Sequence, residues 1–144
     1  MKKIVLILSV LTTIVSGCDK YEQTLKKIYG HYTITTYSVN GVDSLIMYRD
    51  SLGPNFNFFY EEVNDVNVLQ IDGNRNDGNN YPIICKWNLI DKNQVLNILT
   101  AYAYTGTGPF GNNITPKWNL LNIKDGKIQM ATNYNEKEYF IELQ

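Results

Sequence analysis

Short runs in which apolar and polar residues alternate fill the chain from Ile28 to its end, and they constrain its fold more than any other feature. Successive side chains of a β-strand point to opposite faces, so this alternation is typical of strands with one buried face. Turn residues separate the runs, and the pairs Asn40-Gly41 and Asp125-Gly126 favour tight hairpins. The pattern predicts an all-β domain.

The turns are short, which favours antiparallel neighbours in an up-and-down meander. Closing such a sheet on itself removes its exposed edges. We therefore expect an antiparallel, eight- or nine-stranded β-barrel. The expected strands cover Ile28–Val39, Leu45–Tyr48, Phe56–Tyr60, Val66–Ile71, Ile83–Leu89, Val95–Thr100, Trp118–Ile123, Ile128–Thr132 and Tyr139–Leu143.

The N-terminal segment reads as an export signal. Lys2 and Lys3 precede an apolar run that ends in Val15-Ser16-Gly17-Cys18, and this run is shorter than the roughly 20 residues of a membrane span. These last four residues resemble the lipobox of bacterial lipoproteins. The resemblance implies a signal peptide over 1–17, cleavage before Cys18 and acylation of Cys18 with diacylglycerol and a further fatty acid such as palmitate. A plain secretory peptide with an incidental cysteine is the alternative.

Cleavage at this point fixes the mature length and charge. Removing 17 of the 144 residues, with two of the 13 basic side chains, leaves 127 residues with 11 basic and 14 acidic side chains. That length suits one domain, and the acidic balance offers no basic stripe for nucleic acid. The lipid-anchored product is expected in the cell envelope, at the outer membrane, with the membrane face left open.

A tether over 18–27 joins the predicted anchor to the domain. Tyr21, Leu25 and Ile28 recur at helical spacing, so part of this tether is expected to form a helical turn that packs on the domain. The tether is too short to let the domain move far from the membrane.

The domain over 28–144 resembles a known group. The lipobox, the tether, Gly30-His31-Tyr32 in the first strand and the terminal run Tyr139–Leu143 are similar to those of small lipocalin-like (calycin-like) lipoproteins of the Bacteroidetes. In lipocalins the first strand carries Gly-x-Trp, whose ring plugs one end of the barrel, and here Tyr32 stands in place of that tryptophan. The resemblance implies a lipocalin-like barrel that binds a small, partly apolar molecule.

A four-residue motif that occurs twice includes two of the pocket candidates. Lys86-Trp87-Asn88-Leu89 recurs as Lys117-Trp118-Asn119-Leu120, which we interpret as one packing solution used twice, with both tryptophans directed inward. A shared ligand site is the alternative. The candidate pocket residues are Phe58, Trp87, Trp118 and Tyr139.

The two cysteines are not expected to pair. Acylation of Cys18 would leave Cys85 alone, within an apolar strand. A buried, inert thiol is the favoured interpretation of Cys85, over a reactive or intermolecular one.

The sequence argues against an enzyme. His31, the single histidine, is expected on the surface, and no Gly-x-Ser-x-Gly elbow, zinc ligand set or phosphate-binding glycine pattern is present. The loop Asp72–Gly78 fails the EF-hand pattern at its sixth and twelfth positions, which leaves a different calcium loop or an ordinary turn. No catalytic residue, metal or cofactor is therefore expected.

Two binding functions stay open. The first is a membrane-anchored barrel with a small apolar ligand inside it. The second is an interaction module that contacts an envelope protein or glycan through the loop 105–116, with Phe110 at its tip. An enzyme is the least favoured class.

Overall fold

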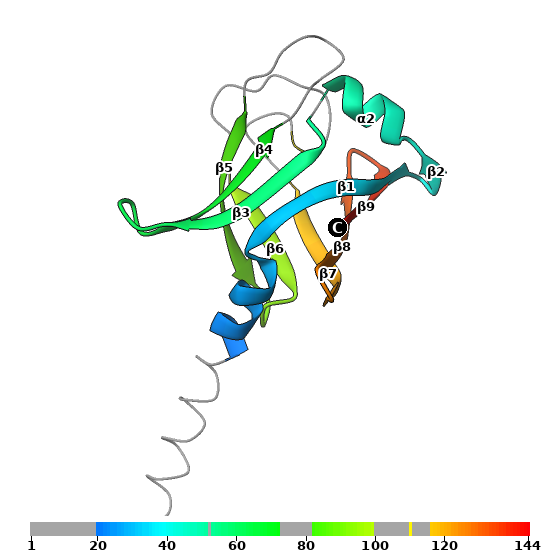
Figure 1. The fold of residues 1–144 in the computed structure, drawn as a ribbon. Helices are drawn as coiled ribbons and strands as arrows, with labels where there is room; N and C mark the ends of the chain where they lie inside the picture. Colours follow the sequence, from blue (N-terminus) through cyan, green and yellow to red (C-terminus); the bar gives the residue numbers. More distant parts are fainter. Residues whose placement is uncertain (1–19, 52, 73–81, 100–109, 111–115) are drawn as a thin grey trace, which may run out of the picture.

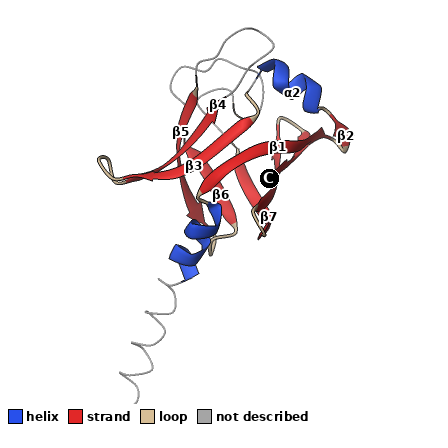
Figure 2. Ribbon diagram, viewed as in Figure 1, coloured by secondary structure: helices blue, strands red, loops and turns tan. Residues whose placement is uncertain are grey.

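The computed structural model describes residues 20–51, 53–72, 82–99, 110 and 116–144, and within them it confirms an all-β fold. Strands dominate, with two short helical segments (Figure 2). None of the described helices is long and apolar enough to cross a membrane. The strands are β1 (Gly30–Val39), β2 (Val42–Asp43), β3 (Asn55–Glu61), β4 (Val66–Asp72), β5 (Ile83–Ile90), β6 (Val95–Leu99), β7 (Lys117–Lys124), β8 (Lys127–Tyr134) and β9 (Lys137–Leu143).

The sheet closes into a barrel. Its strands follow the order β2-β1-β3-β4-β5-β6-β7-β8-β9, every neighbouring pair is antiparallel, and β1 also pairs with β9 (Figure 1). The described barrel therefore has eight strands, with the two-residue β2 attached to β1 as an extra strand. The predicted up-and-down meander is confirmed.

Strand β1 joins the two sides of the barrel. Its first residues, Gly30 to Thr33, pair with β3, and the residues from Ile34 to Val39 pair with β9. A bulge between Ile34 and Thr36 marks the change of partner. Because a bulge adds one residue, it shifts the alternation, so the buried side chains change from even positions to Tyr37.

A polar cluster on the outer surface reinforces this seam. The Glu142 carboxylate on β9 accepts hydrogen bonds from Lys127 Nζ at 3.0 Å and Gln129 Nε2 at 2.6 Å, both on β8, and from Thr35 on β1. The bonds from Gln129 and Lys127 hold the pKa of the Glu142 carboxyl below its ordinary value. The cluster thus fastens three adjacent strands where the barrel closes.

Residues 20–28 form a helix that covers one end of the barrel, which we call the helix end (Figure 1). Tyr21 and Leu25 pack against the barrel core, and Ile28 is fully buried in it. The predicted helical turn in the tether is confirmed.

The opposite end, the α2 end, carries a helix that replaces a predicted strand. Leu45–Tyr48 was expected to form a strand, but it lies in helix α2 (Leu45–Ser51), so that prediction is wrong. The Asp43 carboxylate accepts a hydrogen bond from the Leu45 amide at 3.0 Å, which fixes the start of the helix. Four consecutive apolar residues carry no period of two, and as a helix they turn Leu45 and Tyr48 toward the barrel.

Both predicted tight turns have the expected backbone. Asn40 and Gly41 have φ values of 52° and 76°, and Asp125 and Gly126 have 55° and 73°. Positive φ at two consecutive positions matches a two-residue hairpin with the right-handed twist of the strands.

Gly30 has a different structural role. Its φ is +154°, and a Cβ atom at this position would lie 3.3 Å from the Tyr32 ring. The Tyr32 ring is buried, and its hydroxyl donates a hydrogen bond to the Lys27 carbonyl at 3.1 Å. Gly30 therefore leaves the space in which Tyr32 ties the barrel to the helix.

Replacing Gly30 with alanine is predicted to lower the free energy of unfolding by about 1–3 kcal/mol, because it adds both backbone strain and crowding against Tyr32. Gly41→Ala is the matched control, since Gly41 also has a positive φ but nothing within 4 Å of the added Cβ. Urea unfolding of both variants measures the difference. A loss for Gly30→Ala no larger than that for Gly41→Ala would contradict the role assigned to Tyr32.

Candidate functional site

The four predicted pocket residues all lie in the hydrophobic core of the barrel. Phe58, Trp87, Trp118 and Tyr139 come from β3, β5, β7 and β9, which are alternate strands of the sheet. The structure brings Phe58 and Trp87 into contact, whereas Trp118 and Tyr139 have other aromatic neighbours. The two tryptophans are buried at equivalent positions beside β6, where Trp87 pairs with Ile98 and Trp118 pairs with Leu96.

One aromatic cluster lies at the helix end. Phe58 meets Trp87 edge to face, with ring centroids 5.6 Å apart, and meets Tyr32 at 6.0 Å. Tyr29 also meets Trp87 edge to face, with ring centroids 6.0 Å apart, and its hydroxyl donates a 2.6 Å hydrogen bond to Asn67. These rings and the helix over residues 20–28 together cover this end of the core.

A second aromatic cluster lies toward the α2 end. Phe110 is 1% exposed and stacks on Trp118, with centroids 5.1 Å apart and 15° between the ring planes. It also meets Phe56 edge to face at 5.9 Å. The series of ring contacts runs Trp118, Phe110, Phe56, Tyr48, Tyr37 and Tyr139.

Sequence reasoning found only part of this lining. Phe56 shares the alternation of Phe58 and could have been included, whereas the bulge in β1 hides the inward position of Tyr37. Phe110 was expected at an exposed loop tip, but its ring is buried. The rest of the predicted contact loop, 105–109 and 111–115, lies outside the described residues.

Both tryptophans carry a buried hydrogen-bond donor without an acceptor. Trp87 is 2% exposed and Trp118 is fully buried, and neither indole Nε1–H has a partner among the described residues. Buried indole N–H groups ordinarily find an acceptor, and an unmade bond costs roughly 1–3 kcal/mol. Two such donors in one aromatic core distinguish this interior from ordinary packing.

The barrel itself explains why the indoles have no local acceptor. Backbone carbonyls in a closed sheet are used by the strand ladder, so few of them are free to face inward. Thr132 is the buried polar side chain of the described core, and its hydroxyl donates to the Lys117 carbonyl at 2.8 Å. The unpartnered donors are thus set in an interior that offers them hydrophobic and aromatic neighbours.

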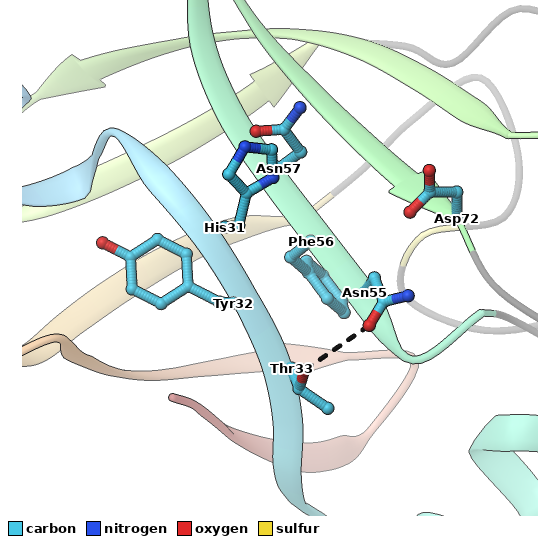
Figure 3. A pocket seen from close by; sticks show the side chains of 7 residues that line it. All are labelled: His31, Tyr32, Thr33, Asn55, Phe56, Asn57 and Asp72. Atoms are coloured by element: carbon cyan, nitrogen blue, oxygen red, sulfur yellow. Dashed lines mark hydrogen bonds between the residues drawn. The ribbon is translucent and has the colours of Figure 1, made fainter.

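A polar hollow on the outer surface is the other candidate. It has a volume of about 240 Å³ and forms beside the last pairs between β1 and β3. Figure 3 shows the exposed His31 imidazole beside Asn57, its cross-strand neighbour. The lining residues are His31, Tyr32, Thr33, Asn55, Phe56, Asn57 and Asp72.

The polar side chains of the hollow depend less on a ligand for their hydrogen bonds than the buried indoles do. Its internal hydrogen bond, between Thr33 and Asn55, is long at 3.4 Å, and both of these side chains are exposed to water. Water can satisfy the polar groups of the hollow, whereas it does not surround the buried indoles. The barrel interior is therefore the stronger candidate site.

No protein-family model matches the chain, and no curated protein matches it. Among solved structures the chain is similar to an uncharacterized protein from Bacteroides eggerthii, at 13% sequence identity and a TM-score of 0.46. That similarity covers 81% of this chain and 98% of the other.

Cys85 lies in the same core and is the free cysteine of the described residues. Its side chain is buried, and its cross-strand partner on β4 is Leu69. Burial raises the pKa of the Cys85 thiol to about 11. The structure confirms the expected burial, and a thiol of this pKa is a poor nucleophile at neutral pH.

A water-soluble disulfide reagent is predicted to leave Cys85 unmodified in the native protein at pH 8, because a pKa of about 11 leaves roughly one thiol in a thousand ionised. The same reagent should titrate one thiol after unfolding, provided that Cys18 is blocked by its lipid. Cys85→Ala, which should show none, is the control. Rapid modification of the native protein would mean that the core opens readily.

Proposed function

We propose that this chain is a lipid-anchored lipoprotein of the cell envelope whose barrel binds a small, partly apolar ligand in its interior. The observation that carries the proposal is the pair of buried indole donors on Trp87 and Trp118, which have no acceptor among the described residues. A ligand with an acceptor atom would satisfy a donor that has no partner in the described part of the chain. The aromatic rings around both donors would supply the apolar contact.

The size of the barrel supports the same function. A closed barrel of eight strands has an interior that suits filling side chains or one small ligand. The packing of Tyr32 on Gly30 at the helix end also supports the resemblance to lipocalins, in which the tryptophan of Gly-x-Trp plugs one end of the barrel.

The anchor part of the proposal depends on the sequence, since Cys18 lies outside the described residues. Its support is the lipobox pattern and the position of the helix over residues 20–28. Because that helix packs on the barrel, only a few residues separate Cys18 from the domain. Two or more acyl chains suffice for stable anchoring, and this tether would keep the helix end facing the membrane.

A second function, contact with an envelope protein or glycan, has separate support. Phe110 is buried and does not offer its ring to a partner, but other apolar side chains are exposed at the α2 end. Val42 is 66% exposed, Ile46 79% and Met47 72%, and all three belong to β2 and α2. A gathering of exposed apolar side chains favours an interaction surface.

Protein purified from its native membrane should retain a small molecule that native mass spectrometry detects. After solvent extraction, returning that molecule should change tryptophan emission, because both tryptophans lie in the proposed site. His31→Asn is the matched control and should bind equally well, since His31 belongs to the outer hollow. Absence of a bound species, together with unchanged emission on adding native lipid and metabolite extracts, would contradict ligand binding.

Cys18→Ala should abolish incorporation of labelled fatty acid and leave an uncleaved precursor, because the thiol is the acceptor of the first lipid. Cys85→Ala should incorporate the label normally, which makes it the control for loss of a cysteine. Labelling is followed by gel autoradiography of whole cells. Continued labelling of Cys18→Ala would overturn the lipid anchor and leave the barrel proposal untouched.

A further inference from the structure

We infer that the interior ligand is uncharged and carries a hydrogen-bond acceptor, such as a ketone, ester or ether oxygen, for an indole N–H. The inference rests on the proposed ligand-binding function and narrows its ligand class. Three properties of the described core support it: two indole N–H groups have no acceptor, several hydroxyls already donate to backbone carbonyls, and no charged side chain is buried.

The unpaired groups are donors. Indole nitrogen carries a hydrogen and no acceptor lone pair, so Trp87 and Trp118 can only donate. A matching ligand therefore has to accept. An alkane or a plain aromatic hydrocarbon would leave both donors unpaired.

Three hydroxyl donors of the core are already used. Tyr32 donates to the Lys27 carbonyl, Tyr48 to the Gly53 carbonyl at 3.3 Å, and Thr132 to the Lys117 carbonyl. Each of these bonds ties the side chain to a backbone carbonyl. The indole N–H groups of Trp87 and Trp118 differ from these hydroxyls, because neither has a partner among the described residues.

Charge excludes an anionic acceptor. The buried core contains no charged side chain among the described residues. A carboxylate brought into this interior would lose its water without gaining a cationic partner, which costs far more than two indole hydrogen bonds return. A neutral oxygen accepts the same hydrogen bond without that loss.

The two donors sit in different surroundings, so they can be tested separately. Trp87 belongs to the edge-to-face cluster with Phe58, whereas Trp118 stacks on Phe110. Each Trp→Phe variant keeps an aromatic ring and removes only the indole N–H and part of the ring. The structure thereby offers two closely matched variants.

The test uses three probes of similar shape: 2-acetylnaphthalene, which is neutral with a carbonyl, 2-naphthoate, which is an anion, and 2-isopropenylnaphthalene, which has no acceptor. The lipidated protein is reconstituted in lipid nanodiscs with ¹⁵N-labelled tryptophan, and the indole N–H signals are followed by NMR. The ketone should move at least one signal downfield and bind about tenfold more tightly than the hydrocarbon, as expected for one added hydrogen bond. The naphthoate should bind more weakly than either neutral probe.

The Trp→Phe variants then locate the acceptor. The variant that removes the shifted signal should lose about tenfold more in ketone affinity than in hydrocarbon affinity, since both probes lose the same ring contact and only the ketone loses a hydrogen bond. The wild-type shift itself needs no variant, so the test survives if one substitution fails to fold. Naphthoate binding as tight as ketone binding, or ketone binding that moves neither signal, would overturn the inferred ligand class and leave ligand binding standing. Failure of all three probes and of the native extracts would instead remove the proposed function.

Discussion

Closure of the barrel depends on β1, which pairs with β3 over Gly30–Thr33 and with β9 over Ile34–Val39. A strand that serves two neighbours in succession has to bend, and the bulge between Ile34 and Thr36 provides the bend. The pairing continues past β9, where Thr33 and the C-terminal Gln144 exchange backbone hydrogen bonds of 2.7 and 2.9 Å. The last residues of the chain thus complete the structure that its first strand begins.

Closure also determines the chemistry of the interior. Once the strands are paired all round, the core is isolated from water and from most backbone acceptors. The same isolation raises the pKa of the Cys85 thiol, and it leaves the indole donors of Trp87 and Trp118 without an acceptor among the described residues. The raised pKa of the Cys85 thiol and the lack of a described acceptor for the two indoles therefore have one cause, which is burial in a closed barrel.

The sequence was sufficient to predict the up-and-down meander, because each strand and turn of a meander is encoded in a short segment of the chain. Alternation and turn pairs such as Asn40-Gly41 predict strands and their order, and eight of the nine predicted strands are present. Helix α2 was missed because four consecutive apolar residues fit a strand or a helix. The hydrogen bond that Asp43 accepts from the Leu45 amide and the packing of Tyr48 decide between the two.

The candidate site was predicted in part for the same reason. Inward positions of Phe58, Trp87, Trp118 and Tyr139 follow from alternation within a strand, and all four are in the core. The indoles have no acceptor among the described residues because of the side chains that the other strands direct into the interior. Those side chains are distant in sequence, so a local pattern does not predict this result. Phe110 is a further case, since its burial depends on contact with Trp118 and Phe56 from distant strands.

Helix α2 exposes apolar side chains that its packing on the barrel does not need. Leu45 and Tyr48 pack the helix on the barrel where β1 and β3 separate, and Tyr48 also bonds to the Gly53 carbonyl. That packing does not require Ile46 and Met47, whose side chains face water. Apolar residues that are not needed for folding lower solubility, so a function at the surface is the simplest reason for them. Such a surface lies at the end opposite the helix over residues 20–28, and a lipid anchor at Cys18 would turn it away from the membrane (Figure 1).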